Sequence, residues 1–196
     1  QRQRVSERGK PSEPDPQTTE INGRGCLFKL PDYNRKKITV MGLGSLGGGS
    51  GAAAYLAGAG AVVTVTDLRS EEQLRPSIDA LSDFPDITYH LGGHCAEDVT
   101  ECDLVVVNPA VREDNSYLQI ARKNNIELKT ELNLLLERNL HQAWIGVTGS
   151  NGKSTTTRLI YEGLNALGHK VFAGGNLGGS LLNRTDDELS GSILVL

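Results

Sequence analysis

The sequence is poor in the features that mark secreted, zinc-binding or membrane proteins. Of its 196 residues only three are cysteine and one is tryptophan, and aromatic residues make up 5%. Three cysteines without a CxxC pattern predict neither a disulfide framework nor a zinc finger, so reduced thiols in a cytosolic protein are the simplest interpretation. No apolar run approaches the roughly 18 residues that would span a membrane.

Basic charge is also scarce. The net charge is −4, with 20 lysines and arginines against 24 acidic residues, and no dense basic stripe is present. We therefore expect neither a nucleic-acid partner nor a membrane partner. Hydrophobic residues at 38% and charged residues at 22% are ordinary for a globular protein, which we expect to be cytoplasmic.

Residues 1–34 lack the apolar content that a packed segment needs. Residues 1–20 contain a single aliphatic side chain, Val5, and the apolar centre of a signal peptide is missing. The chain starts with Gln1 and its only methionine is Met41. We expect residues 1–34 to be a disordered leader, or upstream sequence that does not belong to the folded protein.

From residue 35 onward, strand-like and helix-like segments alternate. Strands are expected at residues 37–41, 61–66, 87–90, 104–107 and 126–128, and helices at residues 51–57, 71–81 and 116–123. This alternation is typical of a doubly wound parallel sheet with right-handed crossovers. The sequence therefore predicts an α/β protein with a Rossmann-like, parallel-sheet domain over residues 35–140, which ends in a linking helix at residues 131–139.

A glycine-rich turn follows the first of these strands. Residues 42–47 read Gly-Leu-Gly-Ser-Leu-Gly, and Asp67 ends the next strand, about 20 residues further on, as in a dinucleotide-binding fingerprint. The alternative is a turn that serves only close helix–strand packing. Gly48, Gly49 and Gly51 each cost the following helix about 1 kcal/mol relative to alanine, so we expect something to approach this backbone closely.

A second glycine-rich turn lies at residues 146–155, with the sequence GVTGSNGKST. It stands between an apolar strand (residues 143–147) and a helical segment (residues 155–167), which is the order of a phosphate-binding loop. Lys153 is placed to reach the β- and γ-phosphates, and the Ser154 hydroxyl to ligate Mg²⁺. Val147 stands where the strict P-loop pattern has glycine, so the loop is a variant.

The part of the chain after this loop is short for a domain. Two further strands are expected at residues 171–173 and 193–196. Residues 141–196 are fewer than the roughly 100 residues that such a domain needs. We predict an incomplete P-loop NTPase-like central domain in a chain that is truncated at its C-terminal end.

Two other groups of residues carry weaker signals. His90, His94 and Cys95 place nitrogen and sulfur near one another, but two glycines intervene and no second ligand pair follows, so we expect a structural or solvated role rather than zinc binding. The acids Asp186, Asp187 and Glu188 are expected on a solvated loop.

Two different nucleotide signatures in one chain make a family resemblance specific. Over residues 36–196 the chain resembles the N-terminal part of the Mur ligases, most of all the D-glutamate-adding members. The matching segments are residues 42–47, 67–69, 92–94, 103–110, 131–132, 148–155 and 174–178. The variant loop TGSNGKS is itself a mark of these ligases and of their folate-ligating relatives.

The resemblance implies that the first domain binds the UDP of a muramoyl substrate rather than a dinucleotide. The implied UDP-substrate residues are Gly44, Ser45, Leu46 and Gly47 at the diphosphate and Asp67, Leu68 and Arg69 at the uracil. The family often has threonine where Leu68 stands, so a hydroxyl contact is lost. Its Ser-Pro-Gly is Asn-Pro-Ala at residues 108–110, which leaves the uridine contacts there open.

For the second domain the resemblance implies ATP and Mg²⁺ as cofactors. The implied ATP-binding residues are Gly149, Ser150, Asn151, Gly152, Lys153, Ser154 and Thr155, with Ser154 as the Mg²⁺ ligand and Lys153 and Asn176 as catalytic residues. The implied reaction is an ATP-dependent ligation. The alanine carboxylate of UDP-N-acetylmuramoyl-L-alanine becomes an acyl phosphate, which the amine of D-glutamate attacks.

Further residues of such ligases are expected beyond Leu196. They are a Mg²⁺-binding glutamate, a histidine, a carbamylated lysine and a third domain that binds D-glutamate. We therefore expect the 196-residue chain to lack ligase activity by itself and, with an unpaired sheet edge, to be poorly soluble. The family is mostly monomeric.

Three other interpretations stay open at this point. An NAD-dependent oxidoreductase would explain the turn at residues 42–47 and Asp67 but not the second loop. A nucleotide-binding module without chemistry would explain both loops. A neighbouring ligase such as the L-alanine-adding enzyme has a similar first domain, but commonly carries histidine where Asn151 stands.

Overall fold

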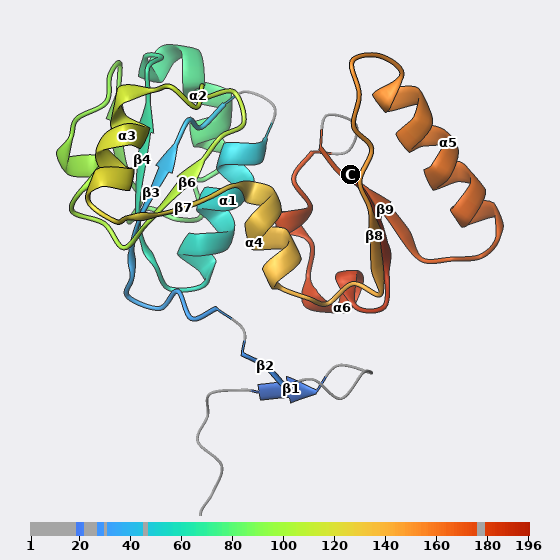
Figure 1. The fold of residues 1–196 in the computed structure, drawn as a ribbon. Coiled ribbons are helices and arrows are strands. Elements are labelled where there is room, and N and C mark those ends of the chain that lie inside the picture. The colour runs from blue at the N-terminus through green and yellow to red at the C-terminus, as the bar shows by residue number, and fades with distance from the viewer. Residues whose placement is uncertain (1–18, 22–26, 30, 45–46, 176–178) are drawn as a thin grey trace, which may run out of the picture. The chain divides into compact units, whose positions relative to one another are not determined.

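The computed structural model describes residues 19–21, 27–29, 31–44, 47–175 and 179–196 (Figure 1). It divides into two compact units, residues 1–31 and 32–196. In the first unit, β1 (Thr19–Ile21) pairs antiparallel with β2 (Leu27–Lys29). A small two-stranded sheet therefore lies within the segment for which the sequence predicted a leader.

The second unit begins with a five-stranded parallel sheet. Its strands are β3 (Lys37–Met41), β4 (Val62–Asp67), β5 (Thr88–Leu91), β6 (Leu104–Val107) and β7 (Glu127–Lys129). They are ordered β5-β4-β3-β6-β7, and every neighbouring pair is parallel. The α/β prediction is thus confirmed. Because the strand order reverses at β3, the crevice for a ligand is expected at the carboxyl ends of β3 and β6.

Helices cover both faces of this sheet, as a doubly wound arrangement requires. The elements are α1 (Gly48–Gly58), α2 (Glu71–Asp79), α3 (Ser116–Lys123) and the 3₁₀ turn η1 (Glu97–Val99). The side chains of β3 alternate between the two faces. Ile38 and Val40 join the core that contains the buried residues of α1 and α2, and Met41 joins the one that contains those of α3 and η1.

Several helices begin at side chains that satisfy their first backbone groups. Asn115 accepts a hydrogen bond from the Tyr117 N–H (2.9 Å) at the start of α3. At the start of α4 (Glu131–Glu137), Thr130 accepts from the Asn133 N–H while Asn133 accepts from the Thr130 N–H. Such reciprocal caps fix where each helix starts.

A second parallel sheet contains three strands. They are β8 (Ala143–Ile145), β9 (Val171–Ala173) and β10 (Ile193–Val195), in the order β8-β10-β9. Helix α5 (Lys153–Ala166) packs against β9 and β10. The chain therefore runs from β8 through the second glycine-rich turn directly into α5, as the sequence predicted.

Two short elements, η2 (Leu181–Asn183) and α6 (Asp186–Leu189), complete the unit. η2 packs against α1 and α4, and its Leu181 and Leu182 belong to the same buried core as Leu56 of α1. The buried Arg138 donates to the backbone carbonyls of Leu182 (3.2 Å) and Arg184 (2.9 Å).

The acids at residues 186–188 do not lie on a loop, contrary to the sequence prediction. They form the first turn of α6, where Thr185 and Glu188 cap each other. Acidic side chains suit this position because a helix N-terminus carries partial positive charge. Asp186 also pairs with Arg138 (2.5 Å), which ties α6 to the end of α4.

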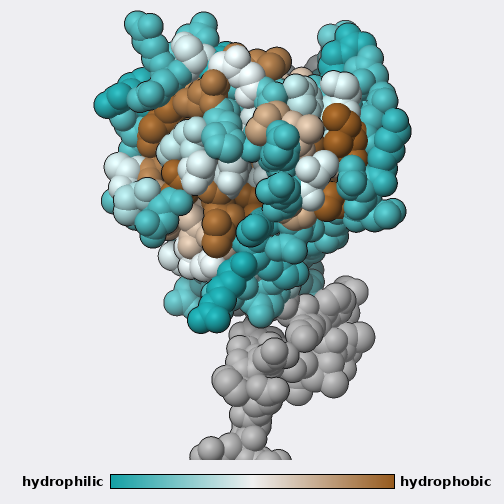
Figure 2. Space-filling model, turned by 90° about the vertical axis from the view of Figure 1, so that its left-hand side faces the viewer, coloured by the Kyte–Doolittle hydropathy of each residue, from teal (hydrophilic) through white to brown (hydrophobic). Residues whose placement is uncertain are grey.

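On the face shown in Figure 2, hydrophobic residues appear in several small patches among hydrophilic residues. The large apolar side chains that the described part of the chain exposes most are Leu167, Leu159 and Leu68. Within that part of the chain, none of the helices has both the length and the apolarity needed to cross a membrane.

Candidate functional site

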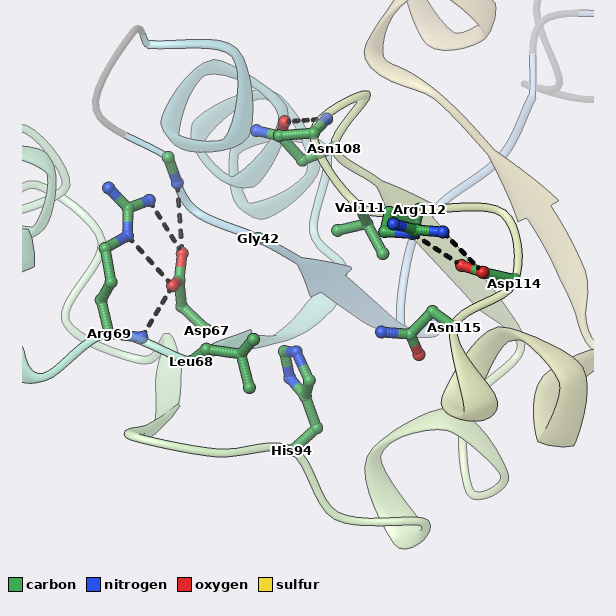
Figure 3. Close-up of a pocket in the computed structure, with 12 residues that line it drawn as sticks. Gly42, Asp67, Leu68, Arg69, His94, Asn108, Val111, Arg112, Asp114 and Asn115 are labelled. Carbon is green, nitrogen blue, oxygen red and sulfur yellow. Dashed lines mark hydrogen bonds and ion pairs between the residues drawn. The ribbon is translucent and has the colours of Figure 1, made fainter.

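A pocket of about 600 Å³ lies at the carboxyl ends of β3, β4 and β6. Its lining comprises Gly42, Gly44, Asp67, Leu68, Arg69, His94, Asn108, Ala110, Val111, Arg112, Asp114 and Asn115 (Figure 3). This is the place where the reversal of strand order predicts a ligand. The pocket brings Gly42 and Gly44 of the first glycine-rich turn together with residues 67–69.

Asp67 anchors the glycine-rich turn. Its Oδ2 accepts hydrogen bonds from the backbone N–H groups of Leu43 (2.9 Å) and Gly44 (3.3 Å). Its Oδ1 accepts from the backbone N–H (3.0 Å) and the Nε–H (3.3 Å) of Arg69, whose Nη2 also pairs with Oδ2 at 3.2 Å. Figure 3 shows the carboxylate between the turn and the guanidinium. Asp67 therefore shapes the pocket floor through bonds to its own chain.

These bonds determine the charge state of Asp67. Burial by itself would raise the pKa of this carboxyl, which is 5% exposed. The hydrogen bonds from Arg69 and from the Gly44 N–H oppose that effect, together with the charge of Arg69, and the pKa lies below its ordinary value. Asp67 is therefore ionised at neutral pH.

From the sequence we expected something to approach the backbone at the glycines of α1, and the approaching atoms belong to the protein itself. A Cβ on Gly49 would lie 2.3 Å from the Leu43 carbonyl oxygen and 2.4 Å from that of Gly42. A Cβ on Gly51 would lie 2.1 Å from Ser180 Oγ, and one on Gly48 would lie 2.6 Å from Glu131 Oε2. Close packing therefore accounts for Gly49 and Gly51 without a ligand, whereas the atom that faces Gly48 is the end of the flexible Glu131 side chain.

Leu68 and His94 form an apolar part of the pocket wall. The side chain of Leu68 stays largely exposed, at 67%, although it is apolar. His94 Nδ1 lies 2.8 Å from Thr66 Oγ1, and its ring meets Tyr117 edge to face. Burial lowers the pKa of His94, against the opposing charges of Asp67 and Asp98, so the ring is neutral at neutral pH. An apolar side chain beside a neutral ring suits a flat, uncharged group such as a base.

The opposite wall comes from the segment after β6, which the sequence assigned only in part. Asn108 lies close to the glycine-rich turn, since a Cβ added to Gly42 would lie 2.9 Å from the Cβ of Asn108. Arg112 and Asp114 form an exposed bidentate pair (3.0 and 2.8 Å) at the rim. Of these residues the sequence reasoning noted Asn108 but missed Arg112 and Asp114. Their position directly after β6, at the reversal of strand order, was the available signal.

The second candidate site is the turn at residues 146–152, between β8 and α5. Gly149 and Gly152 have positive φ angles, 149° and 75°, and Gly152 caps α5. The Val147 N–H donates to the Leu196 carbonyl (2.6 Å), which holds the start of the turn to β10. Lys153 is exposed, and its Nζ donates to the Gly149 carbonyl (2.6 Å).

This turn fits a phosphate group on physical grounds. Helix α5 has 14 residues, no acidic residue in its first turn, and a solvent-exposed N-terminus at residues 150–156. Its first backbone N–H groups and its dipole therefore favour an anion. The hydroxyl of Ser154 lies in the first turn of α5 and is exposed, so it is available to a magnesium ion that accompanies the phosphates.

The remaining predicted site residues are distributed as follows. Gly44, Asp67, Leu68 and Arg69 line the pocket, and Gly47 caps α1 in the left-handed conformation. Gly149, Ser150, Asn151, Gly152, Lys153, Ser154 and Thr155 form the turn before α5 and its first residues. Ser45, Leu46 and Asn176 lie outside the described residues.

A family model and individual relatives both match the part of the chain that contains the first sheet. Residues 36–130 match the family described as Mur ligase MurD-like, N-terminal domain. The chain is 40% identical, over 86% of its length, to UDP-N-acetylmuramoylalanine–D-glutamate ligase of Borreliella afzelii. It is 42% identical, over 72% of its length, to the protein of that name from Treponema pallidum. The chain spans 37% and 26% of these two relatives.

Solved structures give weaker matches. One is a pseudomurein peptide ligase type C from Methanothermus fervidus, at 28% identity and a TM-score of 0.46, with 83% of this chain and 32% of that chain covered. Another is UDP-N-acetylmuramate-alanine ligase from Thermotoga maritima, at 23% identity and a TM-score of 0.49, with 83% and 37% covered.

Proposed function

Because residues 36–130 belong to the MurD-like N-terminal domain family of the Mur ligases, we propose that this chain forms part of an ATP-dependent amide-bond ligase. The proposed enzyme adds D-glutamate to UDP-N-acetylmuramoyl-L-alanine in the synthesis of peptidoglycan precursors. The observation that carries the proposal is the combination, in one chain, of the Asp67-anchored pocket and the anion-ready turn before α5.

The pocket at the carboxyl ends of β3, β4 and β6 is the proposed site for the UDP part of the substrate. The turn that Asp67 holds and the N-terminus of α1 favour the diphosphate, since the first N–H groups of a helix attract anions. Leu68 and His94 offer an apolar wall to the uracil, and Arg69 a charged edge. The Asp67 carboxylate already accepts five hydrogen bonds from Leu43, Gly44 and Arg69, which leaves little capacity for the ribose hydroxyls of an NAD molecule.

The turn at residues 149–155 is the proposed ATP site. Magnesium-bound ATP supplies the phosphoryl group that activates the alanine carboxylate. Lys153 and the N–H groups at the start of α5 neutralise charge on the phosphates, and Ser154 offers its hydroxyl to the metal. To reach the phosphates, Lys153 releases its exposed bond to the Gly149 carbonyl, which costs little because water replaces it.

The chemistry then proceeds in two transfers. A carboxylate oxygen of the alanine attacks the γ-phosphorus, and the bond to the ADP oxygen breaks. The D-glutamate amine attacks the acyl carbon, loses a proton, and inorganic phosphate leaves as the amide forms. From the family resemblance, we propose that Asn176 lies near the reacting carboxylate. We also propose that the reaction takes place in the cytoplasm.

Isothermal titration calorimetry on the 196-residue chain tests both sites separately. We expect UDP to bind, NADH not to displace it, and the MgATP analogue AMP-PNP to bind independently of UDP. Arg69→Ala should weaken UDP binding by about tenfold or more, the effect of one charged hydrogen bond, and leave the analogue's affinity unchanged.

Lys153→Ala is the matched variant with the opposite expected pattern. It should weaken binding of the ATP analogue by a similar factor and leave UDP binding unchanged, because Lys153 lies on the other glycine-rich turn. NADH binding without competition from UDP would replace the proposal with an oxidoreductase. Loss of UDP binding in Lys153→Ala, with the fold intact, would refute the assignment of two separate sites.

A further inference from the structure

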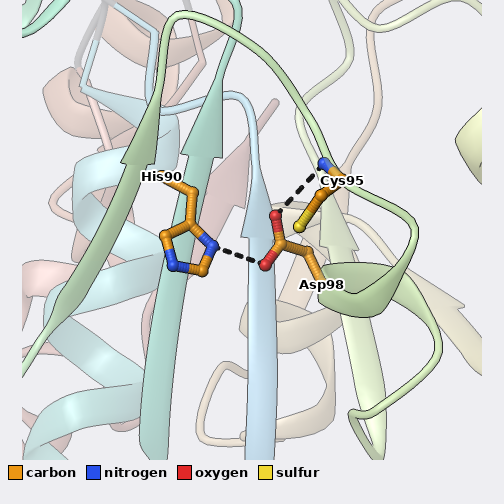
Figure 4. A group of neighbouring side chains, drawn as sticks. All are labelled: His90, Cys95 and Asp98. Atoms are coloured by element: carbon orange, nitrogen blue, oxygen red, sulfur yellow. Dashed lines mark hydrogen bonds and ion pairs between the residues drawn. The ribbon is translucent and has the colours of Figure 1, made fainter.

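Three side chains that the proposed ligase chemistry does not use converge beside the first sheet. They are His90 of β5, Cys95 in the loop after it, and Asp98 of η1 (Figure 4). Their ligand atoms Nδ1, Sγ and a carboxylate oxygen all lie within 4.8 Å of one another. Figure 4 shows the imidazole and the thiol pointing toward the same carboxylate. From the sequence we expected a structural or solvated role for His90, His94 and Cys95 rather than zinc binding; the structure instead groups His90 and Cys95 with Asp98.

Asp98 is the fixed member of this cluster. Its side chain is only 4% exposed, and its backbone carbonyl accepts a hydrogen bond from the Thr39 hydroxyl (2.5 Å) of β3. Its Oδ1 lies 2.5 Å from His90 Nδ1, and its Oδ2 accepts a long hydrogen bond from the Cys95 N–H (3.5 Å). Among the described residues, His90 is the one basic group in contact with this carboxylate, and the contact is an ion pair only when the imidazole is protonated. A buried carboxylate with so little compensating positive charge would gain from a bound cation.

The three ligand types are those of a zinc site. Imidazole nitrogen, thiolate sulfur and carboxylate oxygen bind Zn²⁺ at about 2.0–2.3 Å, so tetrahedral geometry places them about 3.3–3.7 Å apart. From the present 2.5 Å, His90 Nδ1 and the Asp98 carboxylate oxygen would separate by about 1 Å, and Cys95 Sγ, which lies within 4.8 Å of both, would approach by at most about 1.5 Å. His90 is 48% exposed and Cys95 partly buried, so water has access to the fourth position.

We propose that His90, Cys95 and Asp98 bind one Zn²⁺ ion that braces the loop between β5 and β6. The thiolate and the carboxylate neutralise the metal's charge; the thiol proton of Cys95 leaves to solvent on binding, and His90 binds through Nδ1 as a neutral imidazole that carries its proton on Nε2. His94 lies between two of the ligands in sequence, and its ring points away from them toward Thr66 and the pocket. The metal thus holds the segment that positions His94. This site does not depend on the proposed ligase function.

Cobalt is the probe for this site, because a Co²⁺–thiolate bond gives a near-ultraviolet charge-transfer band. We expect the 196-residue chain to bind one equivalent of Co²⁺ with this band, Zn²⁺ to displace it, and Mg²⁺ in excess to have no effect. Cys95→Ser should abolish the band. His90→Gln and Asp98→Asn should each weaken Zn²⁺ binding by at least about tenfold.

Two control variants test whether His90, Cys95 and Asp98 are the ligands, rather than the neighbouring histidine and cysteine. His94→Gln and Cys102→Ser should keep both the band and the Zn²⁺ affinity, since neither residue belongs to the cluster. Absence of the band in the parent chain, its survival in Cys95→Ser, or its loss in His94→Gln would overturn the proposal. If Asp98→Asn fails to fold, the partly exposed positions 90 and 95 decide the question.

Discussion

Replacing Gly49 by alanine tests the packing of α1 on the glycine-rich turn. The new Cβ would lie 2.3 and 2.4 Å from two backbone carbonyl oxygens, those of Leu43 and Gly42. Both oxygens belong to the backbone rather than to a flexible side chain that could move aside, so the helix or the turn must shift. Overpacking of this kind costs about 1–3 kcal/mol, and two backbone clashes at one atom place Gly49→Ala at the upper end.

The higher helix propensity of alanine opposes this cost by about 1 kcal/mol. The expected net loss of unfolding free energy is therefore about 2 kcal/mol, which lowers the thermal midpoint of a domain of 150–250 residues by about 4–8 °C. Thermal unfolding followed by circular dichroism measures this. Because the turn is displaced, UDP binding should weaken in the same variant.

Gly163→Ala is the matched control, since it places the same substitution inside the exposed helix α5. A Cβ there meets nothing within 4 Å, so only the propensity gain remains and the midpoint should rise slightly. A Gly49→Ala protein as stable as the parent would refute the claim that packing, rather than a ligand, requires glycine at this position.

Two further predictions concern charged anchors. Asp67→Asn should lower the unfolding free energy at neutral pH. The folded pKa of Asp67 lies below its ordinary value of 3.8, so the stability that its carboxylate contributes is present above that value and is lost as pH falls through the folded pKa. Urea unfolding should therefore show a smaller difference in unfolding free energy between variant and parent at pH 3 than at pH 7, and a constant difference would contradict this. Arg138→Met should lower the unfolding free energy by about 2–4 kcal/mol, because it leaves the Leu182 and Arg184 carbonyls without their donor. Asp186→Asn, at an exposed carboxylate, should change the unfolding free energy by less than about 1 kcal/mol. Equal effects of the two substitutions would refute the claim that Arg138 acts mainly through these carbonyls.

Local patterns in the sequence predicted most of the first sheet. The strand at residues 37–41 and the helix at residues 116–123 have the predicted bounds, because each combines a clear hydrophobic period with a clear stop. The sequence also singled out the glycine-rich turn and Asp67, because both follow adjacent strands, but it did not predict that Asp67 anchors the turn. Their assignment to a UDP site stays a prediction.

Contacts between distant segments could not be predicted in this way. The glycines of α1 signalled a close approach, but nothing in the sequence indicated that the approaching atoms belong to Ser180, Glu131 and the turn itself. Likewise, His90 and Cys95 stood out by residue type, while Asp98 becomes their neighbour only because η1 turns back toward β5. The sequence also placed Asp186 on a loop, although Thr185 and Glu188 have the spacing of a local capping box; only the pairing of Asp186 with Arg138 depends on residues far apart in the chain.

The packing of η2 on α1 and α4 has a consequence for synthesis of the chain. Leu181 and Leu182 join a core that also contains Leu56 and Leu134, which are made much earlier. A nascent chain that has reached only the end of α4 therefore keeps part of its apolar surface uncovered until η2 emerges from the ribosome. Folding during translation can begin with β3 and β4, but the last apolar face of this half closes only after the second glycine-rich turn has been translated.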